Sequence, residues 1–217
     1  MSGQAGRASR LDRAIRWGTA LLLGGALCFA GWLLAERLSQ PHTLTGAGLI
    51  EERRDLGGPF RLTDQQGRER TQADFAGRVV LLYFGYSFCP DLCPLALQTM
   101  AEARDRLAEP GRVQPLFVTL DPGRDTPERL AGYMAAFGPD FVGLTGARRE
   151  IDRLTRRFGV VYRLRTEVDP AFYPVDHSSR LYVMDGNWNA VAVLADKATV
   201  EQVADALRRA LAEAARG

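Results

Sequence analysis

The sequence predicts an α/β domain whose sheet carries helices on both faces. Two observations predict this fold class. From residue 78 onward, short apolar runs rich in β-branched and aromatic residues alternate with longer amphipathic segments, as strands alternate with helices. The alternation then closes with two strand-like runs and an amphipathic helix. A third feature, an uncharged apolar segment near the N-terminus, predicts one transmembrane helix ahead of the domain.

Local signals justify the elements of the domain in order. Residues 59–71 carry turn-forming residues between two strand-like runs and predict a hairpin. The run at 78–86 is apolar almost throughout, as expected for a buried strand. Thr126 followed by Pro127 predicts the start of a helix, and Gly159 the end of another. The other expected elements are a helix at 95–111, strands at 113–122, 141–146, 160–165, 179–185 and 189–195, and helices at 126–138, 147–159 and 199–215.

This order of elements also predicts the kind of α/β domain. A βαβ half followed by a ββα half is the order of a thioredoxin-like domain. The additional helix and strand between the two halves resemble the elaboration found in peroxiredoxins. The comparison concerns order alone and gains its weight from the cysteines described below.

The N-terminal region predicts a membrane anchor. No charge occurs from Trp17 to Leu34, and a helix of that length spans roughly 27 Å, close to the hydrocarbon core of a bilayer. Arginines precede it, so the positive-inside rule places the N-terminus in the cytoplasm. A cleaved signal peptide, or lipid attachment at Cys28, is the alternative, but the sequence matches neither signal well. The expected domains are a basic tail at 1–16, an anchor at 17–37, a linker at 38–57 and a folded domain at 58–217.

Composition excludes some classes of protein. The chain has 217 residues, of which 46% are hydrophobic and 25% charged, and this argues against long disorder. The formal net charge is only +2, so nothing suggests a nucleic-acid partner. The expected location is the bacterial inner membrane, with one span and the C-terminal domain in the periplasm.

Cys89 and Cys93 are the candidate chemical groups of the domain. Each precedes a proline and the pair follows a buried strand, so we expect Cys93 near a helix N-cap with Pro94 at the first helical position. The positive end of a helix favours thiolate over thiol. The pair is therefore a structural disulfide, a catalytic dithiol or a soft-metal site, and two thiolates with an imidazole suit Cu(I).

His177 is the candidate imidazole. The chain has two histidines, and the other, His42, lies in the expected linker. In a thioredoxin-like order, the loop before the strand at 179–185 faces the helix that carries the cysteines, so we expect His177 to approach them. Nearby, Asp176 is a candidate to orient the histidine, and the segment 162–174 is expected to be mobile. Two further acids, Asp121 and Asp125, are expected either to serve turn and cap chemistry or to form an acidic surface beside the site.

Three stretches carry a resemblance to a known family. "FCPDLCP", "TLDPGRDTPERL" and "VDHSSRLYVMD", in that order and spacing, resemble the Sco/SenC family of membrane-anchored copper proteins needed to assemble cytochrome c oxidase. The resemblance covers about residues 58–207. It implies a thioredoxin-like fold and one copper ion per chain, Cu(I) or Cu(II), held by Cys89, Cys93 and His177.

The resemblance also implies a function and partners. It implies a copper metallochaperone that assists assembly of the copper A centre, with cytochrome c oxidase subunit II as copper acceptor. An upstream copper donor and a thiol reductant are further expected partners. The alternative is an extracytoplasmic thiol–disulfide oxidoreductase that uses Cys89 and Cys93 to keep the oxidase cysteines reduced and needs no histidine.

Overall fold

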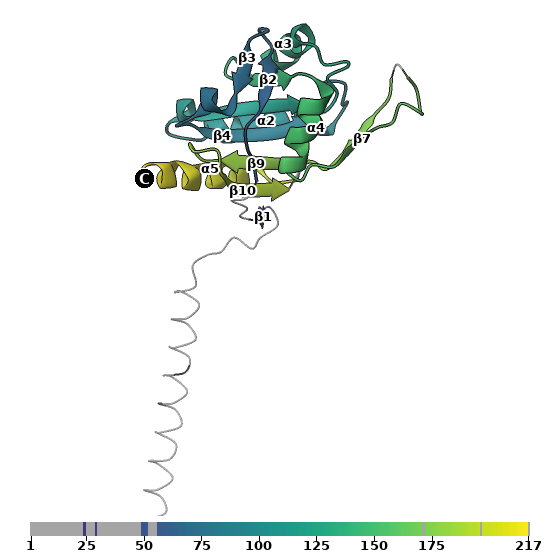
Figure 1. Ribbon diagram of the computed structural model, residues 1–217. Helices are drawn as coiled ribbons and strands as arrows, with labels where there is room; N and C mark the ends of the chain where they lie inside the picture. The colour runs from purple at the N-terminus through teal and green to yellow at the C-terminus, as the bar shows by residue number, and fades with distance from the viewer. Residues whose placement is uncertain are drawn as a thin grey trace, which may run out of the picture. The chain divides into compact units, whose positions relative to one another are not determined.

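The computed structural model describes residues 56–170, 172–195 and 197–216 in full, together with the backbone of 49–51 and the isolated helical positions Gly24 and Phe29 (Figure 1). The chain divides into two compact units, Met1–Leu44 and Thr45–Gly217. No helix within the described ranges is long and apolar enough to cross a membrane. The expected tail at 1–16 and anchor at 17–37 lie almost wholly outside those ranges.

The second unit contains an α/β fold, and this confirms the predicted fold class. In chain order its elements are β1 Leu49–Glu51, β2 Arg61–Asp64, β3 Glu69–Thr71, η1 Gln72–Phe75, β4 Val79–Gly85, α2 Leu92–Asp105, η2 Pro110–Arg112, β5 Val113–Thr119, α3 Pro127–Ala135, β6 Val142–Thr145, α4 Arg148–Arg157, β7 Tyr162–Leu164, β8 Val175–His177, β9 Arg180–Met184, β10 Ala190–Ala195 and α5 Val200–Ala214.

Eight strands form one sheet in the order β1-β10-β9-β4-β5-β6-β2-β3. The central strands β4, β5 and β6 are parallel, and β9 joins β4 in the antiparallel sense. A parallel pair needs a crossover, which α2 and α3 supply. β7 and β8 pair separately as a two-stranded arm that protrudes from the domain (Figure 1).

The core lies on both faces of β4, whose seven residues are all buried. Tyr83 faces α2, because its hydroxyl reaches a cysteine on that helix. The next residue, Phe84, faces the other side and packs against Phe158 at the end of α4 and Tyr182 of β9. A strand buried on both faces explains why 78–86 reads as a continuous apolar run rather than an alternating one.

Asp64 stabilises the β2–β3 hairpin at the edge of the sheet. Its carboxylate is fully buried and accepts hydrogen bonds from the side chains of Arg68 at 3.0 Å and Arg70 at 2.8 Å. The backbone N–H groups of Gln66 and Arg68 also donate to it. Burial alone would raise the pKa of Asp64, but these donors outweigh it and hold the pKa below its usual value.

The structure differs from the predictions at three elements. α2 begins at Leu92, so Pro94 is its third residue rather than its first; the first turn has no intrahelical partner for its N–H groups, so proline is tolerated there. His177 ends a short strand, β8, rather than lying in a loop. β1 lies in the segment expected to be a linker and pairs with β10, antiparallel and with an irregular register.

Candidate metal centre

The two cysteines lie where β4 ends and α2 begins. Cys89 is in the connecting loop and partly exposed, whereas Cys93 is the second residue of α2 and fully buried. Gly85 makes room for the buried sulfur, since a Cβ at that position would lie 2.8 Å from Cys93 Sγ. The last residue of the strand is therefore glycine because the helix start approaches its backbone so closely.

Cys93 contacts both of the other candidate residues. Its backbone N–H donates to Cys89 Sγ at 3.4 Å. Its own Sγ lies 3.9 Å from Nε2 of His177 and accepts a hydrogen bond from the hydroxyl of Tyr83 at 3.8 Å. The structure thus brings together the three residues that the sequence singled out, from a loop, the helix that follows it and a strand 84 residues beyond Cys93.

The pKa values of the two thiols are shifted in opposite directions. The pKa of Cys89 is lowered to about 5, chiefly by a hydrogen bond from the Cys93 side chain. Backbone N–H groups at the start of α2 lower it further, and burial opposes both effects. The same side-chain hydrogen bond, with burial, raises the pKa of Cys93 well above its usual value. Cys89 is therefore the thiolate of the pair at neutral pH, and Cys93 is the thiol that stabilises it.

Two tyrosines and two serines fix the position of His177. The rings of Tyr83 and Tyr86 meet the imidazole edge-on, with centroids 6.3 Å and 6.1 Å away. Its Nδ1 lies 3.4 Å from both the carbonyl oxygen of Ser178 and Oγ of Ser179, while Nε2 faces Cys93. Burial lowers the pKa of His177, so the ring is neutral at neutral pH, the form in which imidazole binds metals.

Arg124 joins the arm that carries His177 to the rest of the site. Its guanidinium stacks on the ring of Tyr173, with 3.6 Å between the guanidinium carbon and the ring centroid. It also donates to the carbonyl of Tyr173 at 2.8 Å and forms an ion pair with Asp121. The hydroxyl of Tyr173 donates to the same carboxylate at 3.0 Å. The sequence analysis missed Arg124 and Tyr173, because no local pattern brings these two residues together.

Asp125 holds the loop before Cys89. Its carboxylate accepts hydrogen bonds from the backbone N–H of Ser87 at 3.0 Å, the hydroxyl of Ser87 at 2.5 Å and that of Thr119 at 2.6 Å. Both Asp121 and Asp125 are buried. The expectation of an acidic surface is wrong at these positions: both side chains face inward to satisfy buried donors, and Thr126 caps α3 as predicted.

Asp176 lies on the outer side of the arm. It is exposed and pairs with Arg165 at 2.9 Å, and no hydrogen bond among the described residues connects its side chain to the imidazole. Side chains alternate along a strand, so Asp176 points away from the face to which its neighbour His177 contributes. Of the segment expected to be mobile, residues 162–164 form β7 and pair with β8; the mobility itself stays a prediction.

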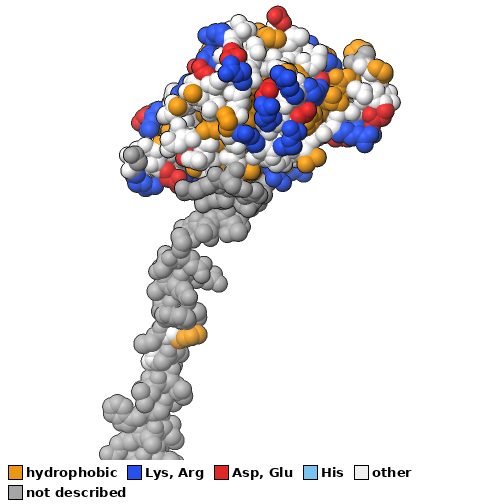
Figure 2. All heavy atoms as spheres, in the orientation of Figure 1, with side chains coloured by type: hydrophobic (Ala, Val, Ile, Leu, Met, Phe, Trp, Pro, Cys, Tyr) orange, Lys and Arg blue, Asp and Glu red, His pale blue; other side chains and the backbone are white. Residues whose placement is uncertain are grey.

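Exposed apolar side chains surround the site. In the described part of the second unit, every large exposed hydrophobic residue lies on one of two segments, 88–95 or 161–172. They are Phe88, Leu92, Leu95, Val161, Val168 and Phe172. A cavity of about 260 Å³ opens between the two segments beside Tyr86 and Arg124. Figure 2 shows hydrophobic side chains along the protruding arm. Such a concentration of apolar surface is typical of a contact region.

The donor set suits a soft metal ion. Two sulfur ligands and one imidazole favour Cu(I) over harder cations. Two ligand atoms sharing one ion in a trigonal arrangement lie roughly 3.8 Å apart, and Cys93 Sγ and His177 Nε2 are 3.9 Å apart. Within the described ranges, however, no three such side chains converge closely enough to hold an ion as they stand. Cys89 Sγ accepts a hydrogen bond from the backbone N–H of Cys93, and binding requires the three side chains to move closer together.

Comparisons with known proteins identify relatives of the chain. The model of the family described as SCO1/SenC matches residues 50–212. The chain is 40% identical over 158 residues to the mitochondrial SCO2 homolog of Bos taurus, covering 71% of this chain and 59% of that protein. It is 39% identical over 153 residues to SenC of Rhodobacter capsulatus, covering 70% and 69%. The chain thus spans 59% of the length of the bovine relative.

A solved structure of a relative supports the fold, and that relative was solved with copper bound. ScoI of Bradyrhizobium japonicum, solved with copper bound, has a TM-score of 0.65 and 34% identity, covering 71% of this chain and 98% of that one. This likeness confirms the thioredoxin-like fold expected from the order of elements.

Proposed function

Because the chain belongs to the SCO1/SenC family, we propose that it is a copper metallochaperone that assists assembly of the copper A centre of cytochrome c oxidase. The observation that carries the proposal is the position of Cys93, whose backbone N–H donates to Cys89 Sγ and whose buried sulfur lies 3.9 Å from Nε2 of His177. One copper ion per chain is held by these three residues. The copper-bound relative from Bradyrhizobium japonicum supports this cargo.

The acidities of the three groups favour copper uptake. Cys89 is already a thiolate at neutral pH and His177 is already neutral, so neither loses a proton when the metal arrives. Cys93 is protonated and must lose its proton. Uptake therefore releases about one proton per copper ion, and raising the pH strengthens binding until Cys93 is ionised.

Delivery proceeds by exchange of ligands. Cys93 is fully buried, whereas Cys89 is partly exposed, so an incoming thiolate of the acceptor reaches the metal from the Cys89 side. The acceptor in this proposal is subunit II of the oxidase, with an upstream copper donor and a thiol reductant as further partners. The apolar segments 88–95 and 161–172 flank the entry and are the surfaces that the acceptor meets first.

The location follows from the N-terminal sequence. A helix at 17–37 anchors the chain in the bacterial inner membrane, and the folded domain works in the periplasm. The support is the uncharged run from Trp17 to Leu34 behind four arginines. Protease digestion of spheroplasts tests this topology: the domain is degraded if it faces the periplasm and survives if it faces the cytoplasm.

Anaerobic Cu(I) titration of the reduced full-length protein in detergent, against a competing chelator, tests the copper site. The chain supplies matched controls: Cys28→Ser beside Cys89→Ser and Cys93→Ser, and His42→Ala beside His177→Ala. We expect one tightly held ion, weakened by each of the three site substitutions and by neither control. Copper binding that survives all three site substitutions would contradict the proposed ligand set.

A thiol–disulfide oxidoreductase is the second candidate, favoured by the opposite acidities of the two thiols. A partly exposed thiolate next to a buried thiol is the arrangement in which one sulfur attacks a disulfide and the other resolves it. His177→Ala separates the functions. A variant that loses copper but still reduces a disulfide-bonded acceptor peptide at the wild-type rate shows that thiol exchange is independent of the metal.

A further inference from the structure

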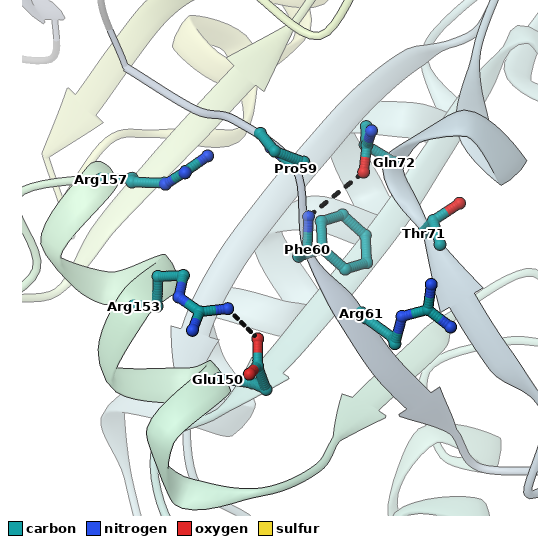
Figure 3. A pocket seen from close by; sticks show the side chains of 8 residues that line it. All are labelled: Pro59, Phe60, Arg61, Thr71, Gln72, Glu150, Arg153 and Arg157. Carbon is teal, nitrogen blue, oxygen red and sulfur yellow. Dashed lines mark hydrogen bonds and ion pairs between the residues drawn. The ribbon is translucent and has the colours of Figure 1, made fainter.

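A second cavity shares no residue with the copper site. It lies between the start of β2 and one face of α4 and has a volume of about 440 Å³. Figure 3 shows Arg153 and Arg157 reaching from α4 on one side of Pro59 and Phe60, with Arg61 on the other side. The remaining lining residues are Thr71, Gln72 and Glu150.

The lining of this cavity is cationic. Its charged lining residues are three arginines, Arg61, Arg153 and Arg157, and one acid, Glu150. Arg153 pairs with Glu150 at 2.8 Å and Arg61 pairs with Glu69 outside the cavity. Both arginines in these pairs are more than half exposed, and such pairs contribute little free energy. An anion entering the cavity can therefore recruit both arginines at small cost.

Arg157 differs from these two arginines. It is half-buried, and no described residue forms an ion pair or hydrogen bond with its guanidinium. The group lies directly over Gly58, where a Cβ would be 2.1 Å from Nη1. Gly58 has a φ of +135°, a conformation that favours glycine, so this residue both makes the turn and leaves room for the guanidinium. A half-buried guanidinium that no described carboxylate pairs with is available to bind an anion.

We propose that this cavity binds a phosphate group, with Arg157 as the principal contact and Arg153 and Arg61 as the flanking ones. The planar fork of a guanidinium matches two phosphate oxygens at once. The site is independent of the copper site. Its phosphate comes either from an anionic phospholipid headgroup or from the free ion in solution.

The basic surface of α4 makes the lipid headgroup the source of greater interest. Figure 2 shows Lys and Arg side chains gathered over α4, which carries Arg148, Arg149, Arg153, Arg156 and Arg157. Basic residues close to an anionic membrane surface are attracted to it.

Hydrogen exchange of the full-length protein tests the proposal. Exchange at 58–61 and 148–157 is followed in zwitterionic detergent with inorganic phosphate added, and separately with phosphatidylglycerol or phosphatidylcholine in the micelles. Sodium chloride at equal ionic strength controls for screening. Arg157→Gln is compared with Arg156→Gln, which removes the same charge one residue earlier on α4 but outside the cavity. Arg153→Gln serves as a second cavity variant, and thermal melts verify that each variant folds.

We expect phosphate or phosphatidylglycerol to protect these segments, and Arg157→Gln to weaken that binding by about tenfold, as for a lost hydrogen bond to a charged group. Arg156→Gln leaves it unchanged. Protection by inorganic phosphate alone identifies the free ion, and protection by phosphatidylglycerol alone identifies the headgroup. Absence of protection by either ligand overturns the proposal. So does equal weakening by Arg156→Gln, because binding would then belong to the basic surface as a whole.

Discussion

The guanidinium of Arg124 and the ring of Tyr173 link the two halves of the candidate metal centre. The ring lies 3.6 Å from the guanidinium carbon, and the carbonyl of the same tyrosine accepts a hydrogen bond from Arg124. Tyr173 belongs to the arm that ends in His177, whereas Arg124 follows β5 and also stacks on Phe88, next to Cys89, at 4.6 Å. One side chain thus contacts both the segment that carries the histidine and the loop that carries the exposed thiolate.

We predict that Arg124→Ala loosens the arm. The substitution removes the stacking, the hydrogen bond to Tyr173 and the ion pair with the buried Asp121. Amide hydrogen exchange at 162–177 should rise at least about tenfold in the copper-free protein, because a contact to a charged group is lost. Cu(I) affinity should fall as well. Binding would then have to order the segment that carries His177, and this ordering reduces the net free energy of binding.

Arg129→Ala is the matched control for this prediction. Arg129 also stacks on Phe88, at 4.0 Å, but donates to Ser87 and forms no hydrogen bond or ion pair with the arm among the described residues. It should leave exchange at 162–177 unchanged. If both variants raise exchange in the arm equally, the linking role of Arg124 is wrong. Because the exchange measurement uses copper-free protein, it does not depend on the proposed copper chemistry.

The acidity of Cys89 gives a prediction about reactivity. With a pKa of about 5, Cys89 is fully ionised above neutral pH. Its rate of alkylation by iodoacetamide in the reduced protein should therefore be nearly constant from about pH 7 to about pH 9, whereas the rate for an ordinary thiol rises steeply there. Mass spectrometry of the alkylated peptide measures the rate for this cysteine alone.

Cys93→Ala tests the cause of that acidity. The hydrogen bond from Cys93 is the largest contribution to the lowered pKa of Cys89, so its removal should move the alkylation midpoint upward toward about 8.5, the value of a free cysteine. An unchanged midpoint would assign the acidity to the backbone N–H groups at the start of α2 instead. A steep rise in the wild-type rate above neutral pH would contradict the prediction for Cys89 itself.

The sequence predicted the parts of the structure that local patterns encode. The buried run of β4, the cap at Thr126 and the hairpin at 59–71 each carry their signal within a few residues. The approach of His177 to Cys93 was predicted from the order of elements, which sets where a segment lies in the sheet. By contrast, the contact of Arg124 with Tyr173 spans 49 residues and depends on how the arm folds back, and no pattern along the chain encodes it.

The same limit explains why the sequence left two roles open for Asp121 and Asp125, turn and cap chemistry or an acidic surface. A sequence shows that a residue is acidic, but not that buried donors such as Ser87 and Thr119 surround it. Both residues lie in the loop after the buried strand β5, where the sequence does not indicate which side chains point inward. The side chain of Asp125 points inward because Ser87, in the loop before Cys89, and Thr119 of β5 donate hydrogen bonds to it.

Asp64 gives a prediction about acid stability. Its folded-state pKa lies below the usual value, so its stabilising contribution is fully present above about pH 4, the unfolded-state pKa, and is lost as the pH falls through the folded-state value. We expect Asp64→Asn to lower the free energy of unfolding by about 3 kcal/mol at neutral pH, because buried hydrogen bonds to Arg68 and Arg70 are weakened. Urea unfolding at a series of pH values measures both quantities.

The difference between wild type and Asp64→Asn should shrink as the pH falls below about 4, because protonated aspartate and asparagine are both neutral. Asp74→Asn is a useful comparison, since Asp74 lies near the same hairpin but its side chain is 35% exposed rather than buried, and it should cost about 1 kcal/mol or less. A gap between wild type and Asp64→Asn that is constant at every pH would show that ionisation of Asp64 does not stabilise the fold.

The apolar segments around the site give a prediction about copper transfer. Phe172 is 77% exposed and Leu95 is 57% exposed, and both lie on segments that flank Cys89 without being candidate ligands. Under the proposed function, Phe172→Ser and Leu95→Ser should slow transfer of Cu(I) to a soluble copper A domain by about tenfold or more, since each removes a large apolar contact from the docking surface. Stopped-flow absorbance of the acceptor measures the rate.

The Cu(I) affinity of each variant, determined against the chelator, should stay at the wild-type value. Glu102→Ser changes an exposed residue farther along α2 and should leave both quantities unchanged. Slower transfer together with weaker affinity would mean that these side chains hold the site in shape, whereas unchanged transfer would mean that the acceptor approaches over another surface.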